Sequence, residues 1–98
     1  GIFGTPGTVN SESYFIEINK LHPTIKVSQE ACPIWVPLIE NNEFNSEGGH
    51  FFVKQHVDIL MSKDPEIDTI ILGCTHYPLL QKILFFLLYP FPLIFSIL

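Results

Sequence analysis

The strongest candidates for chemically reactive residues are Cys74, Thr75 and His76, within the stretch 71–78, ILGCTHYP. They follow an apolar run of strand length, and Pro78 is suited to the first turn of a following helix. A thiol at a strand end that faces the amino end of a helix lies in a field favouring the thiolate, the form that takes a proton or attacks. His76 can hydrogen-bond to this thiol or to a substrate carboxylate. The alternative is a small buried cysteine beside a capping or surface histidine.

Two other predicted strand ends carry weaker candidates. The segment GTPGT contains Thr5 and Thr8 between a strand and a helix, where backbone N–H groups can face an anion; a plain tight turn is the alternative, because the spacing matches neither a Rossmann nor a Walker loop. Cys32 is either a second thiol or a packing residue. Glu40 follows the apolar VPLI, so it is either a partly buried acid or orienting group, or a solvated glutamate.

A zinc site is a further alternative, with ligands drawn from Cys32, Cys74, His22, His50, His56 and His76. The close ligand pairs CxxC and HxxxH do not occur in the sequence. Because such pairs are typical of zinc sites, we expect no metal.

The elements that must position these residues alternate along the chain. We predict strands over 1–5, 24–31 and 67–74, and helices over 9–21, over 38–44, from Ser46 to Asp64 and from Pro78 onward. This order predicts an α/β fold with three layers, a parallel sheet flanked by helices. Ligands of such folds collect beyond the carboxyl ends of the strands, where all three candidate segments lie.

Composition narrows the function. The 98 residues include 10 acidic side chains against 5 basic ones, all lysine. Without arginine the bidentate contacts typical of nucleic-acid recognition cannot form, so we exclude nucleic acid as a partner. Two cysteines are too few for a disulfide scaffold, and we expect a cytoplasmic protein with a free thiol.

Three stretches, GTPGTVNSESY, ACPIWVPLIENNEF and IDTIILGCTHYPLL, resemble successive blocks of bacterial glutamate racemase. The resemblance covers residues 1 to about 82 and implies a partial racemase-like α/β domain, one of the two domains of that fold. It implies a cofactor-independent isomerase that interconverts L- and D-glutamate for peptidoglycan synthesis. In the family, two cysteines on opposite faces of the substrate exchange its α-proton.

The resemblance also implies roles for individual residues. Cys74 resembles the second acid/base cysteine, and Cys32 does not match its partner. The implied catalytic residues are Cys74, His76 and Glu40, and the implied substrate-binding residues are Thr75, His76, Thr5 and Thr8.

The motifs expected in the amino-terminal racemase domain, one with Cys-Asn-Thr and one with Asp-Ser, are not in this sequence. Racemisation needs a proton donor and an acceptor on opposite faces of the substrate. We therefore expect that this chain alone does not racemise glutamate and that the amino-terminal domain is its partner. The resemblance also allows a homodimer of the full-length enzyme.

The segment 83–98, ILFFLLYPFPLIFSIL, departs from the family as an apolar tail without charge. We interpret it as an out-of-frame or truncated end that favours aggregation. A membrane anchor is the alternative, although the segment is short for a span and contains two prolines. For the whole chain, the alternatives are a non-catalytic remnant, a small membrane-associated interaction protein or, more weakly, an aspartate racemase.

Overall fold

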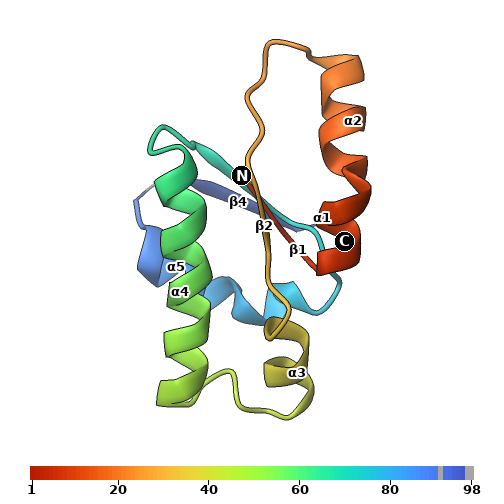
Figure 1. The fold of residues 1–98 in the computed structure, drawn as a ribbon. Coiled ribbons are helices and arrows are strands. Elements are labelled where there is room, and N and C mark those ends of the chain that lie inside the picture. The colour runs from red at the N-terminus through yellow and green to blue at the C-terminus, as the bar shows by residue number, and fades with distance from the viewer. Residues whose placement is uncertain (91, 97–98) are drawn as a thin grey trace.

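The computed structural model describes residues 1–90 and 92–96 and contains one four-stranded sheet (Figure 1). The strands are β1 (Ile2–Gly4), β2 (Gln29–Ala31), β3 (Thr69–Leu72) and β4 (Leu93–Ser96). Their order is β2-β1-β3-β4, and all three pairings are parallel. The predicted α/β fold with a parallel sheet is confirmed.

Helices flank this sheet. They are α1 (Pro6–Ser11), α2 (Ser13–Leu21), α3 (Trp35–Glu40), α4 (Glu47–Lys63), the 3-10 helix η1 (Tyr77–Leu80) and α5 (Gln81–Leu88). The helices α4 and α5 lie on one side of the sheet and α2 on the other (Figure 1). This arrangement gives the three expected layers.

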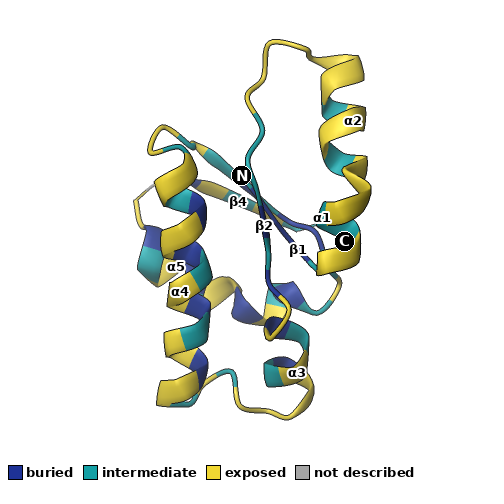
Figure 2. Cartoon of the chain, viewed as in Figure 1, coloured by how far each residue is buried: buried dark blue, intermediate teal, exposed yellow. Residues whose placement is uncertain are grey.

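The core lies between the sheet and the α4–α5 layer. In β3, Ile70 and Leu72 are fully buried and alternate with half-buried neighbours, as in a strand with one face toward the core. Val53 and Leu60 of α4 belong to the same buried cluster. Helix α2 has no buried residue, and Figure 2 shows its largely exposed surface. The two faces of the sheet are therefore covered unequally.

Local signals explain most helix boundaries. Ser46 caps α4, because its Oγ accepts a hydrogen bond from the N–H of Gly49 at 3.0 Å. A Cβ on Gly49 would lie 2.1 Å from the carbonyl oxygen of Glu43, so this close approach requires glycine. The helix ends at Asp64, before Pro65, as predicted.

Other boundaries differ from the predictions. The helix predicted over 9–21 is two helices, because Glu12 adopts a left-handed conformation with φ of 55°. Helix α3 begins before the predicted 38–44 segment. It accommodates Pro37 in its first turn, where the missing N–H has no intrahelical partner to lose. The strand predicted over 24–31 is regular only in β2.

Much of the apolar segment 83–98 is part of this architecture. It contributes most of α5 and all of β4, whose residues Leu93 and Phe95 pair with Thr69 and Ile71 of β3. Across the described residues, no helix combines the length and apolar character needed to cross a membrane. The family boundary at residue 82 stays a prediction.

Candidate active site

The carboxyl ends of β1, β2 and β3 meet at one edge of the sheet. The N–H of Gly73 donates to the carbonyl of Phe3 at 2.8 Å, and the N–H of Cys32 donates to the carbonyl of Gly4 at 2.8 Å. The residues that follow these strands, Thr5 and Cys74 among them, are thereby placed at neighbouring strand ends. The predicted convergence of the three segments is observed.

At this edge a thiol, an imidazole and a carboxylate form a row. The Sγ atom of Cys74 lies 3.8 Å from Nδ1 of His76, and Nε2 of His76 lies 3.7 Å from Oε2 of Glu40. The side chain of Glu40 is 61% exposed, so the solvated alternative, and not the buried one, describes this carboxylate. The three predicted catalytic residues are thus brought together from α3 and the loop after β3.

The geometry of this row suits proton transfer. A neutral imidazole carries a proton on one ring nitrogen and accepts on the other. In the tautomer with its proton on Nε2, toward the Glu40 carboxylate, the accepting nitrogen of His76 is Nδ1, which faces the Cys74 thiol. Both contacts are long and open to solvent, which leaves each group free to reach a substrate.

The helix after Cys74 differs from the expectation. The next element is the short η1, and the N–H of Tyr77 donates to the carbonyl of Cys74 at 3.0 Å. The α-helix α5 begins only at Gln81. Because one turn of 3-10 helix sums few peptide dipoles, His76 and not a helix dipole is the main group available to assist the thiol.

The predicted substrate-binding threonines have mixed surroundings. Thr5 caps α1, with its Oγ1 accepting from the N–H of Thr8 at 3.4 Å, and the two hydroxyl oxygens lie 3.0 Å apart. Thr75 is exposed beside Cys74. A role for all three in substrate binding stays a prediction.

Cys32 is a packing residue. Its side chain is fully buried and its Sγ contacts the carbonyl of Glu30 at 3.6 Å. Burial, reinforced by the negative charge of Glu30, strongly raises the pKa of the Cys32 thiol. The thiol therefore stays protonated at neutral pH, and the second-thiol interpretation is wrong.

Residues that the sequence analysis did not assign support the site. The indole of Trp35 packs against the ring of Tyr77, with centroids 5.2 Å apart, and the Tyr77 hydroxyl donates to the carbonyl of Cys32 at 3.5 Å. These contacts hold η1, and so the loop carrying His76, against the end of β2. In the sequence, the feature that could have indicated this role is the aromatic character of Trp35 and Tyr77 within ACPIWVPLIENNEF and IDTIILGCTHYPLL.

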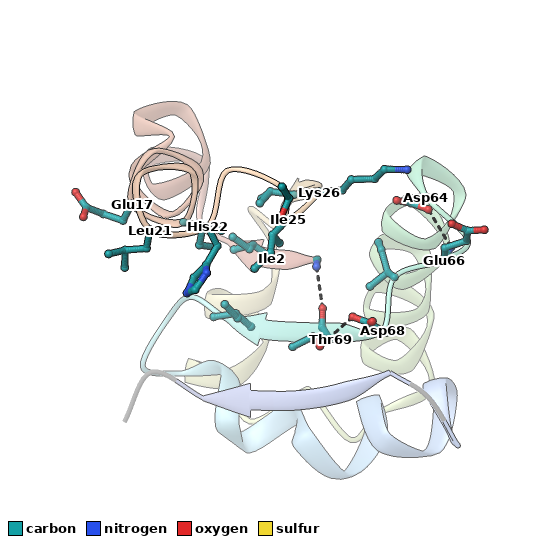
Figure 3. A pocket seen from close by; sticks show the side chains of 16 residues that line it. Ile2, Glu17, Leu21, His22, Ile25, Lys26, Asp64, Glu66, Asp68 and Thr69 are labelled. Atoms are coloured by element: carbon teal, nitrogen blue, oxygen red, sulfur yellow. Dashed lines mark hydrogen bonds between the residues drawn. The ribbon is translucent and has the colours of Figure 1, made fainter.

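The described residues at this edge form no metal site, and a cavity elsewhere in the molecule does not include the row of Cys74, His76 and Glu40. Among the described residues, no three His, Cys, Asp or Glu side chains are grouped to hold a metal ion. A cavity of about 700 Å³ lies between α2, the loop after it, and strands β1 and β3 (Figure 3). Its lining includes Glu17, His22 and Asp68, and Cys74 and His76 are not among the described residues that line it.

Comparisons with known proteins identify relatives of this chain. No family model matches the chain. Over 85 residues, 86% of the chain, it is 49% identical to glutamate racemase 2 of Caldanaerobacter subterraneus subsp. tengcongensis, covering 31% of that protein. The chain is homologous to a segment of glutamate racemase.

Solved glutamate racemases share the fold. An isoform from Bacillus anthracis matches with a TM-score of 0.90 and 38% identity, over 98% of this chain and 35% of that one. The enzyme from Francisella tularensis, in complex with D-glutamate, matches with a TM-score of 0.85 and 30% identity, over 97% of this chain and 35% of that one. The chain thus spans about a third of the glutamate racemases it matches.

Proposed function

We propose that this chain supplies one of the two catalytic thiols of a glutamate racemase that interconverts L- and D-glutamate without a cofactor. The observation that carries the proposal is the row of Cys74, His76 and Glu40 at the carboxyl edge of the sheet, in a chain homologous to glutamate racemase. The Francisella relative was solved with D-glutamate, which supports glutamate as the substrate.

In the proposed reaction the Cys74 thiolate removes the α-proton of one enantiomer, and a second thiol delivers a proton to the opposite face of the α-carbon. In the reverse direction Cys74 donates its proton. His76 accepts or returns the thiol proton through Nδ1, and Glu40 orients the imidazole through Nε2. Thr75, Thr5 and Thr8 are proposed to contact the substrate from the same edge.

The second thiol is proposed to come from an amino-terminal racemase domain. Cys32 is buried and protonated, so it cannot serve the opposite face of a substrate at Cys74. This chain alone is therefore expected to be inactive. Its proposed setting is the cytoplasm, where D-glutamate is supplied for peptidoglycan, and the complete enzyme is proposed to form a homodimer.

Complementation tests the proposal. The chain is co-expressed with the part of the Caldanaerobacter glutamate racemase that lies outside the matched segment, and α-proton exchange of glutamate is followed in heavy water by NMR. We expect exchange from the pair, none from either part alone, and none from the pair carrying Cys74→Ser. Cys32→Ala is the matched control and should retain exchange.

Three outcomes would refute the proposal. Unchanged exchange by the Cys74→Ser pair would remove this thiol from the mechanism. A complex that forms but exchanges aspartate and not glutamate would assign the chain to an aspartate racemase. A stable complex that exchanges neither amino acid would identify a non-catalytic remnant.

A further inference from the structure

Helix α2 approaches the site at one point. Because Glu12 adopts a left-handed conformation after α1, α2 begins at Ser13, and Tyr14 is its second residue. A Cβ placed on Gly73 would lie 3.2 Å from Cε2 of Tyr14 and 2.9 Å from the carbonyl oxygen of Phe3. The tyrosine ring therefore packs over the glycine that directly precedes Cys74.

We propose that Tyr14 is a positioning residue for Cys74, holding Gly73 against β1 and covering the α2 side of the thiol. Gly73 is buried, Cys74 and Tyr14 are half-buried, and Nδ1 of His76 lies 3.8 Å from the Cys74 thiol. With its α2 side covered, the thiol meets other molecules from the side that His76 occupies.

One-sided access suits the proposed reaction, because each thiol of a two-thiol racemase must act on one face of the α-carbon only. The importance of Tyr14 for catalysis rests on the proposed function, but its contact with Gly73 does not. The pKa of Tyr14 agrees with this placement. It is raised above its ordinary value, first by burial of the phenol and then by the nearby negative charge of Cys74.

Alkylation of the thiols tests the covering role. The 98-residue chain is treated with iodoacetamide, and the two cysteines are resolved by mass spectrometry, with the buried Cys32 as internal reference. Tyr14→Ala should speed alkylation of Cys74 roughly threefold or more, because thiol reactivity follows access. Tyr14→Phe keeps the ring and should leave the rate within about twofold of the parent. An unchanged rate in Tyr14→Ala would overturn the proposal.

A tyrosine titration remains informative if Tyr14→Ala unfolds, which alkylation of Cys32 would reveal. The Cζ resonance of ¹³C-labelled Tyr14 is followed with pH in the parent, in Cys74→Ser and in Cys32→Ser. Because the negative charge of Cys74 contributes to the raised pKa of Tyr14, Cys74→Ser should lower this pKa toward 10.0, whereas Cys32→Ser should leave it unchanged.

An equal pKa of Tyr14 in the parent and in Cys74→Ser would overturn the proposal. Unfolding of the variant cannot explain this result, because it would change the pKa of Tyr14 in the variant alone. Both readouts use this chain without glutamate or a second domain. Loss of the Tyr14 effect is thus distinguishable from failure of the racemase assay.

Discussion

Two histidine–glutamate pairs in this molecule differ in the distance between their polar atoms and in the exposure of their side chains. Nδ1 of His56 lies 2.7 Å from Oε2 of Glu30, and both side chains are only 11% exposed. Nε2 of His76 lies 3.7 Å from Oε2 of Glu40, and these side chains are 38% and 61% exposed. The same two residue types therefore make one close, buried contact and one loose, open contact.

The buried pair joins two layers of the fold. Glu30 lies in β2, and His56 lies in α4 with Lys63, whose Nζ contacts Oε1 of Glu30 at 3.0 Å. Lys63 also donates to the carbonyl of Gln29. The Glu30 carboxylate thus has a partner on each oxygen, as a buried charge requires. Through these contacts with Glu30, His56 and Lys63 hold α4 against the sheet.

The contact between His76 and Glu40 restrains its two side chains much less. At 3.7 Å and with solvent on both sides, its contribution to stability is that of a surface ion pair, about 0–1 kcal/mol. His76 is free to turn toward Cys74 or a substrate at little energetic cost. The comparison teaches that the closer contact joins two layers of the fold and that the looser one leaves its two side chains free to move.

The largest expected effect comes from breaking the buried pair. Glu30→Ala leaves His56 and Lys63 without their carboxylate and should lower the free energy of unfolding by about 3–5 kcal/mol. Urea denaturation followed by circular dichroism measures this loss. Glu40→Ala is the matched control, expected to cost under about 1 kcal/mol, and equal losses in the two variants would erase the distinction between the pairs.

For activity we expect the opposite order, in which a change in the His76–Glu40 pair has a larger effect than a change in the His56–Glu30 pair. In the complemented enzyme, His76→Asn should slow α-proton exchange by about 10²-fold or more, because an acid–base group in contact with the thiol is removed. His56→Asn, at matched folded concentration, should leave exchange nearly unchanged. Exchange rates in heavy water decide between these outcomes, and a faster loss with His56→Asn would invert the assignment.

The burial of Cys32 is expected to make the stability of the protein depend on pH. Since burial raises the pKa of Cys32, the unfolded chain loses the thiol proton at a lower pH than the folded chain. The stability that this group contributes is full below the unfolded thiol pKa, near 9.0, and falls as pH rises above it. Between pH 9 and 10 the free energy of unfolding should drop by about 1 kcal/mol.

Urea denaturation at several pH values measures this slope. Cys32→Ala should be less stable at neutral pH but should lose the decline that starts near pH 9. A parent protein whose stability stays flat up to pH 10 would contradict the assigned burial of Cys32.

The smallest effect is the coupling within the open pair. A double-mutant cycle with Glu40→Gln and His76→Gln should give a coupling energy under about 0.5 kcal/mol that vanishes in high salt. The same cycle at Glu30 and His56 should give about 1–3 kcal/mol. Comparable coupling energies in the two cycles would show that exposure does not separate these pairs.

Sequence patterns predicted the candidate site residues better than they predicted the contacts that support those residues. The cluster of Cys74 and His76 is local, because both follow one apolar strand, and β1 and β3 are continuous apolar runs. Glu40 was a candidate because it follows the apolar VPLI, but only the family resemblance connected it with Cys74 and His76, since no pattern within 71–78 indicates a partner in α3.

What sequence patterns missed depends on distant packing. The contact of Glu30 with His56 joins residues 26 positions apart, which no periodicity reveals. The left-handed Glu12 breaks a helix whose apolar spacing continues on both sides. The segment 83–98 was set aside for its composition, but β4 obtains its place by pairing with β3, an interaction that composition does not encode.

The position of β1 in the sheet order also sets the order of assembly. Ile2 pairs with Gln29 on one side and with Ile71 on the other, so β1 is synthesised before β3 but is complete only when β3 has emerged. At about 5–20 residues per second, the ribosome leaves one edge of this apolar strand open for several seconds. Cys74 follows β3 after one glycine, so the nascent chain positions this thiol in the same late step that closes its central strand.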